Sequence, residues 1–560
     1  ATQAASRAAH QDAGSAEAAQ PQGGRVLVTT PIFYVNGQPH IGHAYSGLLC
    51  DALARWLRIR GEQVLFSTGT DEHGAKVEQA ARDAGASSVL EFCDGISGRF
   101  KELFQRLNCA NDAFIRTTDA KHKETVAALW ERLERAGFIV EGNHAGWYCQ
   151  SDEAFLTDKQ VVERDGKRVS AESGHPVEWL EESNYVFRLP ALQDEVLAWL
   201  NTPGALQPTV RRNEIISFLQ RNEMRELSVS RPSSRVAWAI PVPENPDQAI
   251  YVWLDALTNY LTVAGVRIDS DPSVPVSWRD AGVAKVYHIV GKDIIRFHTV
   301  FWPAFLLAAG IEAPNHVIAH AHWTVEGTKM SKSLGNVICP FDLLDEYELD
   351  AVRYFLLRHG GLTDDNDYSP AALETRRKDE LANTYGNLLG RSLVKSITPE
   401  DSWPGAAANT DPAESPLAQK VLVGLADKVN GHFENLEFAR GTDAIMVALY
   451  EANRMFTNTE PWVARKKLKQ GGLSPGEEQV VLEEVSTNMF WILETLRVSS
   501  ILLQPLIPDA AGRALDALGI PPGERTFAAA RAFTTSEQAA ARTFLRPKKG
   551  AIVLFPRRDD

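Results

Sequence analysis

The chain has 560 residues, of which 44% are hydrophobic and 23% are charged, with a formal net charge of −14. This length exceeds what one hydrophobic core organises and predicts about three to four domains, while no apolar run approaches the roughly 20 residues of a membrane-spanning helix. The acidic balance argues against nucleic-acid binding through overall charge, although a local basic groove is compatible with it.

The five cysteines are scattered through the chain and form no CxxC pair. This spacing disfavours a disulfide framework and a cysteine zinc site, and it fits a reducing compartment. Residues 1–24 are rich in Ala, Gln, Ser and Gly and show almost no hydrophobic periodicity. We therefore expect a disordered leader, or the remnant of a processed presequence, in this segment.

Residues 26–43 predict a buried strand, a tight turn and the first turn of a helix. The strand is indicated by β-branched and apolar residues bounded by proline and Asn-Gly turn signals. Apolar residues then recur at three- and four-residue steps up to Gly61, which is a natural helix end. A helix N-terminus that follows a strand suits phosphate, and here it carries His40, Gly42 and His43 in place of a glycine-rich fingerprint.

Residues 64–74 predict a second apolar strand that ends in a polar loop. Strand, helix and strand with short links form a parallel βαβ unit, whose ligands lie at the carboxyl ends of the strands. His40, His43 and Asp71 are then expected at one edge. The alternative is that Asp71 and His73 only cap the following helix.

Residues 115–235 have a different pattern, with short strands and a hairpin turn at Asp165-Gly166. We interpret this segment as an insertion of small mixed elements between two halves of the sheet. Cys149 stands alone in it, so metal binding has little support.

The α/β pattern resumes after Pro243. Residues 250–260 predict a helix that carries Trp253, Ala256 and Tyr260 on one face, and residues 286–290 and 316–320 predict buried strands. A helix with further aromatic residues follows Gly291-Lys292-Asp293. Such aromatic stripes more often belong to a core than to a pocket, and the residues alone leave both interpretations open.

Residues 326–336 form a polar, glycine-flanked loop that contains Lys329 and Lys332. A mobile lysine-rich loop suits a polyphosphate whose charge grows during phosphoryl or nucleotidyl transfer, although an arbitrary pair of lysines usually lies on a solvated surface. From about residue 370 the pattern is helical and typical of a bundle. Trp462 lies beside a group of cations there, which suits the stacking of an unpaired RNA base or a half-buried surface position.

Two sequence motifs, in the order in which they occur along the chain, resemble those of a known family. His40-Ile41-Gly42-His43, followed far downstream by Lys329-Met330-Ser331-Lys332-Ser333, resembles the signature pair of class I aminoacyl-tRNA synthetases. Residues 31–34, 69–74, 251–256 and 291–302 are similar to methionyl-tRNA synthetase in particular. The resemblance runs from about residue 25 into the helical bundle.

The resemblance implies an α/β fold class: a Rossmann-like parallel-sheet catalytic domain with an inserted connective domain, followed by an all-α anticodon-binding helical bundle. The expected segments are the leader at 1–24, the catalytic halves at 25–114 and 236–325, the connective insertion at 115–235, the KMSKS loop and linking domain at 326–370, and the helical domain at 371–560.

The implied activity is that of a methionine–tRNA ligase. L-methionine would react with ATP, accompanied by Mg²⁺, to give methionyl-adenylate and pyrophosphate, and would then pass to the 3′ end of tRNA(Met). Because the transition state is a crowded anionic phosphorus, catalysis rests on positioning and electrostatics. His40 and His43 would hold the phosphates, and Lys332, assisted by Lys329, would contact the departing pyrophosphate. The implied ATP-binding residues are His40, Gly42, His43, Gly291, Asp293 and Lys332, with Asp293 near the ribose.

For the amino acid, the resemblance implies that Asp71 pairs with the α-ammonium group and that a soft apolar pocket holds the thioether. That pocket would comprise Ile32, Tyr34, Trp253, Ala256, Tyr260, Ile294, Phe297, His298 and Trp302. Tyr260 could also donate a hydrogen bond to the sulfur, and Leu257 stands where family members often have proline. The zinc-bearing cysteine knuckle of the family is reduced to Cys149, so we expect no structural zinc and no other metal ligand in the protein.

In the bundle, Asn387 and Arg391 are one helical turn apart and match the family's anticodon-reading pair, while Trp462 matches the tryptophan that stacks on the first base of the CAU anticodon. Residues 174–177, 228–234 and 321–325 look most like the mitochondrial form. We therefore expect a monomer in the mitochondrial matrix, without membrane contact; a bacterial cytoplasmic enzyme is the alternative.

The residues disfavour two rival functions. A synthetase for isoleucine, valine or cysteine is disfavoured because the insertion is too short for an editing domain and the cysteine cluster is missing. A catalytically inactive RNA-binding module would be expected to have lost His40, His43 or Lys332, and all three are present.

Overall fold

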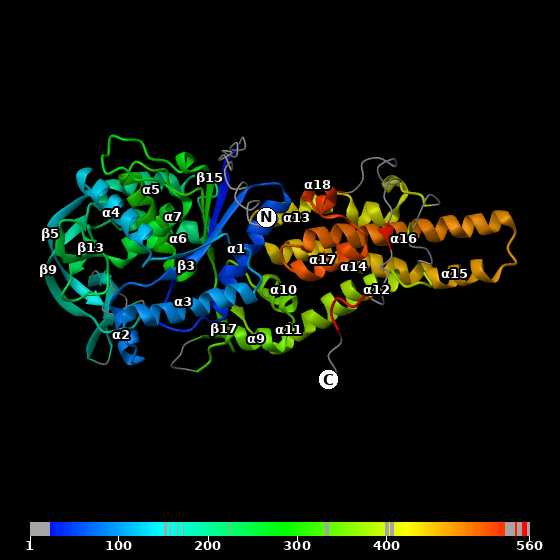
Figure 1. The fold of residues 1–560 in the computed structure, drawn as a ribbon, viewed down its shortest axis with the longest axis horizontal. Coiled ribbons are helices and arrows are strands. Elements are labelled where there is room, and N and C mark those ends of the chain that lie inside the picture. Colours follow the sequence, from blue (N-terminus) through cyan, green and yellow to red (C-terminus); the bar gives the residue numbers. More distant parts are fainter. Residues whose placement is uncertain are drawn as a thin grey trace, which may run out of the picture.

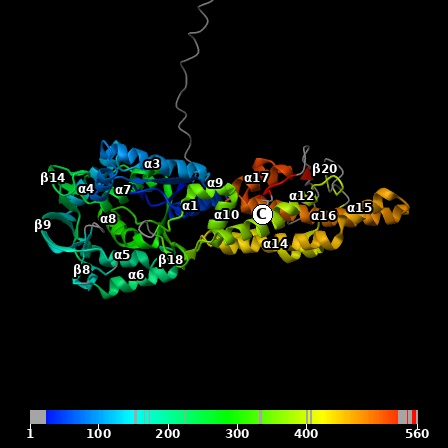
Figure 2. The ribbon, with the colours of Figure 1, turned by 90° about the horizontal axis from the view of Figure 1, so that it is seen from below.

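The structure is a computed structural model, and it describes residues 23–149, 154–156, 158–164, 166–171, 173–222, 224–330, 335–397, 402–403, 408–531, 544–545 and 552–556. The molecule is elongated, with an α/β body at one end and a bundle of long helices at the other (Figure 1, Figure 2). This arrangement confirms the predicted fold class.

A parallel sheet forms the centre of the α/β body. Its strand order is β10-β16-β15-β1-β3-β2, and β4 also pairs with β3. Every pairing in it is parallel. The strands are β1 (Arg25–Thr29), β2 (Phe33–Tyr34), β3 (Val64–Asp71), β4 (Ala113–Arg116), β10 (Leu206–Gln207), β15 (Val283–Gly291) and β16 (His316–His320).

Helices bury both faces of this sheet, as a parallel sheet requires. Val26 and Val28 of β1 face one hydrophobic cluster, and Leu27 faces the other. The first cluster is contributed by α1 (Ile41–Ile59) and α3 (Val89–Arg106), together with the helical bundle. The second is contributed by α4 (Ala120–Arg135), α7 (Val252–Ala264) and α8 (Trp302–Ala308). The helix α2 (Ala75–Asp83) precedes α3.

The segment predicted as an insertion contains a second, antiparallel sheet of order β11-β9-β5-β6. Its strands are β5 (Ile139–Cys149), β6 (Ala154–Leu156), β9 (Glu178–Phe187) and β11 (Leu227–Ser228), with α5 (Gln193–Leu200) and α6 (Thr209–Arg221) between the last two. The predicted hairpin joins β7 (Val161–Arg164) to β8 (Lys167–Ser170), although Asp165 itself lies outside the described residues. The short strand β10 falls within the same segment of sequence but pairs with β16 at the edge of the main sheet.

Two small sheets complete the α/β body. One is formed by β12 (Ser230–Pro232), β14 (Asn245–Ile250) and β13 (Pro241–Val242), and the other by β18 (Thr328–Lys329), β17 (Trp323–Val325) and β19 (Asn366–Asp367). The chain then continues through α9 (Pro340–Glu346) and α10 (Leu349–His359) into the bundle.

The bundle contains α11 (Pro370–Thr375), a π-helix at Arg376–Gly386, α12 (Asn387–Ser392), α13 (Leu425–Phe433), α14 (Phe438–Thr459), α15 (Pro461–Gln470), α16 (Pro475–Leu503), α17 (Pro508–Ala517) and α18 (Phe527–Ala530). Within the described part of the chain, no helix combines the length and hydrophobicity needed to span a lipid bilayer.

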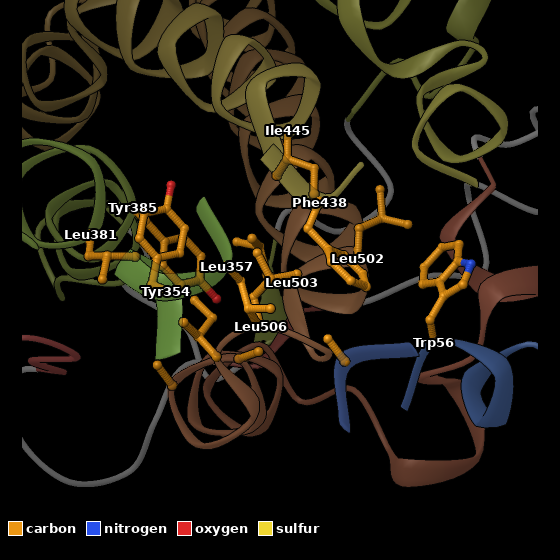
Figure 3. Close-up of a cluster of buried hydrophobic side chains, with 14 of the residues drawn as sticks. Trp56, Tyr354, Leu357, Leu381, Tyr385, Phe438, Ile445, Leu502, Leu503 and Leu506 are labelled. Carbon is orange, nitrogen blue, oxygen red and sulfur yellow. The ribbon is translucent and has the colours of Figure 1, made fainter. Parts of the chain in front are cut away.

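The α/β body and the bundle share one continuous hydrophobic core. It runs from Val26 in the first strand to Phe555 near the end of the chain. Figure 3 shows part of it, with Trp56 of α1, Tyr354 of α10 and Leu502 of α16 among the labelled side chains. The two parts are therefore packed into one body and are not joined by a linker alone.

A buried arginine crosses the same junction. The Arg353 guanidinium of α10 lies 2.6 Å from Asp51 Oδ2 of α1, and neither side chain is exposed. The same guanidinium donates hydrogen bonds to the carbonyl oxygens of Leu107, Pro505 and Leu506. One side chain thus ties the first helix of the sheet to the end of α16.

Candidate active site

The N-terminus of α1 is capped by its own histidines. His40 is the N-cap residue, and its Nδ1 accepts a hydrogen bond from the Gly42 N–H over 3.1 Å. In return, the His40 N–H donates to Nδ1 of His43 over 3.1 Å, and the two rings are stacked with centroids 3.7 Å apart. A side chain at position 42 does not fit, because its Cβ would lie 2.9 Å from the His40 ring.

This capping fixes the tautomer of both rings. A ring nitrogen that accepts an N–H carries no hydrogen, so in the neutral rings the hydrogen of each is on Nε2. The site therefore has two Nε2–H donors at the positive end of a helix dipole, which is the chemistry that phosphate oxygens require.

A cavity of about 800 Å³ opens beside this helix end. It is lined by His40, Gly42 and His43 and by residues at the carboxyl ends of β3 and β15, including Asp71, Gly291 and Asp293. A Cβ at Gly291 would lie 2.7 Å from Asp293 Oδ1, so a side chain at this position would displace the Asp293 carboxylate. The ends of parallel strands thus bring together residues that are 250 positions apart, as the βαβ pattern predicted.

The alternative role for Asp71 and His73 is wrong. The N-cap of α2 is Gly74, and no side chain makes a capping hydrogen bond there. Asp71 instead ends β3 and lines the cavity, and His73 points into a buried polar cluster.

Aromatic side chains form the other end of the cavity. Trp253 and Phe297 are stacked with centroids 3.5 Å apart and an interplanar angle of 6°. The predicted methionine-binding residues that line the cavity are Ile32, Tyr34, Asp71, Trp253, Ala256, Tyr260, Ile294, Phe297 and His298. Trp302 is fully buried next to Tyr260, with ring centroids 5.7 Å apart, and it supports this wall from behind.

The polar groups of this wall form a fixed chain of hydrogen bonds. His298 Nδ1 lies 3.0 Å from the carbonyl oxygen of Ile294. Because a carbonyl oxygen can only accept, the hydrogen of the neutral His298 ring is on Nδ1. The ring therefore accepts a hydrogen bond at Nε2 from the Tyr260 hydroxyl over 2.7 Å. Burial lowers the pKa of His298 to about 4, which keeps this ring neutral. The Tyr260 hydroxyl hydrogen is therefore donated to His298. A hydrogen bond from Tyr260 to the sulfur of methionine would require this contact to break.

A second buried cluster holds α7 from behind. Asp255 accepts hydrogen bonds from His73 Nδ1 over 2.7 Å and from His122 Nε2 over 2.8 Å. Burial alone would raise the pKa of Asp255, but the interactions with the two histidines outweigh it and lower that pKa to about 2. His73 follows two residues after Asp71, the last residue of β3, and Asp255 lies on α7 with Trp253 and Ala256. The cluster therefore holds the carboxylate end of the cavity against the apolar end.

Several cavity residues were not predicted as site residues. His320 ends β16, and its Nε2 lies 2.7 Å from Ser46 Oγ in the second turn of α1. Its position as the last residue of a predicted strand was a usable signal. Trp147 and Trp179 also line the cavity from the antiparallel sheet, and nothing in their local sequence indicated this.

The remaining predicted residues lie elsewhere or are not described. Lys332 falls at residues 331–334, outside the described part of the chain, and of Lys329 only the backbone is described, in β18. In the bundle, the Arg391 guanidinium is 5.9 Å from the centroid of the Trp462 ring, and Asn387 begins the same helix α12. The described residues contain no cluster of three or more His, Cys, Asp and Glu side chains that could hold a metal ion.

Comparison with known proteins adds a second line of observation. The family model described as "tRNA synthetases class I (M)" matches residues 26–393. The chain is 44% identical to the "Probable methionine--tRNA ligase, mitochondrial" of Dictyostelium discoideum, over 89% of this chain and 86% of that protein. It is 41% identical to the human "Methionine--tRNA ligase, mitochondrial", over 90% and 85% of the two chains.

A solved structure is similar over nearly the whole chain. The Mycobacterium tuberculosis methionyl-tRNA synthetase in complex with methionyl-adenylate superimposes with a TM-score of 0.84 at 40% identity, covering 95% of this chain and all of that one. The bacterial relatives are thus about as similar in sequence as the mitochondrial ones.

Proposed function

The chain belongs to the methionine-specific class I tRNA synthetases, and we propose that the cavity beside α1 activates methionine with ATP and then transfers it to the 3′ end of tRNA(Met). One observation carries the proposal. Two imidazole Nε2–H donors at a helix N-terminus share a cavity with a carboxylate, Asp71, and an aromatic pocket. This combination suits a ligand with phosphate, ammonium and thioether groups.

In the first step, a carboxylate oxygen of methionine attacks the α-phosphorus of ATP, and the bond to the bridging oxygen breaks so that pyrophosphate leaves. His40 and His43 donate hydrogen bonds to phosphate oxygens, whose negative charge increases in the transition state. Gly42 and Gly291 let the nucleotide approach the backbone, and Asp293 lies near the ribose. Lys332 and Lys329 belong to the loop that contacts pyrophosphate. Mg²⁺ would enter bound to ATP and would neutralise part of the phosphate charge, while His40 and His43 would act as hydrogen-bond donors to the phosphate oxygens.

The cavity selects methionine by charge at its Asp71 end and by shape at its aromatic end. Asp71 pairs with the α-ammonium group, and the stacked Trp253 and Phe297, with Ile32, Tyr34, Ala256 and Ile294, surround the thioether. Polarisable sulfur packs well against aromatic edges. Tyr260 and His298 form the polar part of this wall, backed by Trp302.

In the second step, a ribose hydroxyl of the 3′-terminal nucleotide of the tRNA attacks the carbonyl carbon of the adenylate and forms an ester bond. The bond from that carbon to the phosphate oxygen breaks, and AMP leaves with the hydroxyl proton. We assign the reading of the CAU anticodon to Asn387, Arg391 and Trp462 in the bundle. We further propose a monomer that works in the mitochondrial matrix, on the similarity to the named mitochondrial relatives; the bacterial cytoplasm is the alternative. Immunolocalisation in the source cells and light scattering of the purified protein test these two points.

Methionine-dependent exchange of pyrophosphate into ATP tests the assigned activity. We expect exchange with methionine and none above background with isoleucine, valine or cysteine at equal concentration. Exchange that is absent with methionine, or equal with isoleucine, would overturn the assignment.

A further inference from the structure

A row of apolar side chains crosses the antiparallel sheet where it faces the cavity. Trp147 of β5 lies directly opposite Trp179 of β9 on one side and opposite Leu156 of β6 on the other. All three line the same cavity as His40 and Asp71. Residues that are paired across antiparallel strands project from one face of the sheet, so this row forms a continuous surface.

The surface is aromatic and open to solvent. Trp179 is 55% exposed, which is unusual for an indole ring that lies on a regular strand. Its ring meets that of Trp147 edge to face, with centroids 5.3 Å apart. Buried residues of this sheet, among them Ile139, Tyr185 and Phe187, belong to the second hydrophobic cluster, which includes neither tryptophan.

Polar neighbours hold Trp147 in place and add positive charge. Its Nε1–H donates to Asp158 Oδ1 over 3.0 Å, and the Arg168 guanidinium lies 4.4 Å from the centroid of its ring. Arg225, an exposed residue just before β11, lines the same cavity. A fixed aromatic surface beside guanidinium groups matches the chemistry that binds unpaired nucleobases and their phosphates.

We propose that Trp179 and Trp147 form a stacking platform for the unpaired bases at the 3′ end of the tRNA during the transfer step. The inference rests on the proposed function, because that function requires a single-stranded 3′ end to enter this cavity. The sheet edge with His40 and Asp71 is occupied by the adenylate at that stage. The insertion supplies the facing wall, and the platform is the aromatic part of that wall.

The test compares Trp179→Ala and Trp179→Phe with the wild-type chain in two assays. The first is methionine-dependent pyrophosphate exchange, which needs no RNA. The second is single-turnover transfer from preformed enzyme-bound adenylate, measured with full-length tRNA(Met) and with a minihelix that contains only the acceptor arm. Val162→Ala on β7, which removes another exposed apolar side chain of the insertion, is the matched control.

We expect Trp179→Ala to weaken transfer to both RNAs by roughly fivefold or more, the usual effect of removing one base-stacking side chain, with exchange changed less than about twofold. Trp179→Phe should restore most of the transfer, because a phenyl ring still stacks. Trp462→Ala should weaken transfer to full-length tRNA and not to the minihelix, and Val162→Ala should change neither assay.

Three results would contradict the proposed stacking role. They are an unchanged rate of transfer in Trp179→Ala, equal losses of exchange and transfer in Trp179→Ala, or no recovery of transfer in Trp179→Phe. A wild-type chain without methionine-dependent exchange would instead overturn the proposed function. The two failures are therefore distinguishable.

Discussion

Asp255 is a charged group that is held in the protein interior by two imidazoles, with 1% of its surface exposed. Asp255→Asn replaces one acceptor oxygen by an N–H donor, which then faces a histidine N–H. Hydrogen bonds to charged groups are worth about 1.5–3 kcal/mol, so we expect the free energy of unfolding at pH 7 to fall by about 2 kcal/mol in urea titrations.

The contribution of Asp255 to the free energy of unfolding decreases as the pH is lowered. The folded-state pKa of Asp255 is lowered from 3.8 to about 2, so its contribution is complete above about pH 4 and is lost as the pH falls toward 2. The difference in stability between the wild type and Asp255→Asn should therefore shrink across this window. Asp83→Asn, at an exposed helix end, should change stability by less than about 0.5 kcal/mol at every pH. A difference that stays constant from pH 5 to pH 2.5 would contradict the assigned charge.

Lys332 is assigned to a contact that forms mainly in the transition state. We expect Lys332→Ala to slow methionine activation by more than about tenfold with the KM for methionine nearly unchanged, because an interaction absent from the ground state affects kcat alone. Pyrophosphate exchange at varied methionine concentration measures both constants. Lys329→Ala should have the smaller effect, and an unchanged rate in Lys332→Ala would exclude the role.

At the scale of the elements, Arg353 joins three segments that the sequence separates widely. Arg353→Met would leave the Asp51 carboxylate buried without its closest counter-charge and would remove the donor to the Leu107, Pro505 and Leu506 carbonyls. Removing one partner of a buried pair costs about 3–5 kcal/mol when the other charge is left uncompensated. Because Asp51 keeps its ion pair with Arg55 over 2.8 Å, we expect a loss of unfolding free energy at the lower end of this range, about 3 kcal/mol.

A surface pair gives the matched control for this prediction. Arg82 and Glu78 lie 2.9 Å apart on α2, with 60% of the arginine side chain exposed. Arg82→Met should cost less than about 1 kcal/mol in the same urea titration. Equal losses of unfolding free energy in Arg353→Met and Arg82→Met would mean that burial of the Arg353 ion pair does not increase its contribution to stability.

The elements that could be predicted from the sequence are those with strong local periodicity. The helix at α7 and the strands β15 and β16 were confirmed near their predicted positions, because apolar spacing alone defines them. The strand β10 was not predicted, since two residues carry no periodicity and their pairing with β16 is a tertiary contact.

The residues of the candidate site likewise divide into those that local sequence predicts and those that depend on tertiary packing. Residues inside motifs, such as His40 and Asp71, were placed at one edge because strand ends of a parallel sheet converge. Trp179 could not be predicted, since its place on the cavity depends on how the antiparallel sheet faces the parallel one. The buried position of Trp302 also follows from packing that no spacing reveals.

At the scale of the whole molecule, the helices α12 and α15, which carry the assigned anticodon residues, belong to the helical bundle (Figure 1). The strands β3 and β15, whose ends line the cavity, belong to the α/β body. Trp462 is 38% exposed and lies beside Phe456 and Arg391. We expect Trp462→Ala to raise the KM for tRNA(Met) in aminoacylation by roughly 5- to 100-fold, the range for loss of one stacked base, while pyrophosphate exchange is spared. Val463→Ala, an exposed neighbour, should leave both assays unchanged. Equal losses in the two assays of Trp462→Ala would mean that Trp462 acts through the stability of the protein and not through a contact with tRNA.

The continuous core has a consequence for modularity. Side chains of α1, which carries the histidine pair, and of α16 in the bundle belong to the same buried cluster, so neither half of the molecule has a complete interior of its own. Separating the chain between α10 and α11 would expose apolar surface on both fragments. The α/β body and the helical bundle should thus melt in one calorimetric transition. A chimera that joins either part to the other part of a distant relative should fail to pack the shared core.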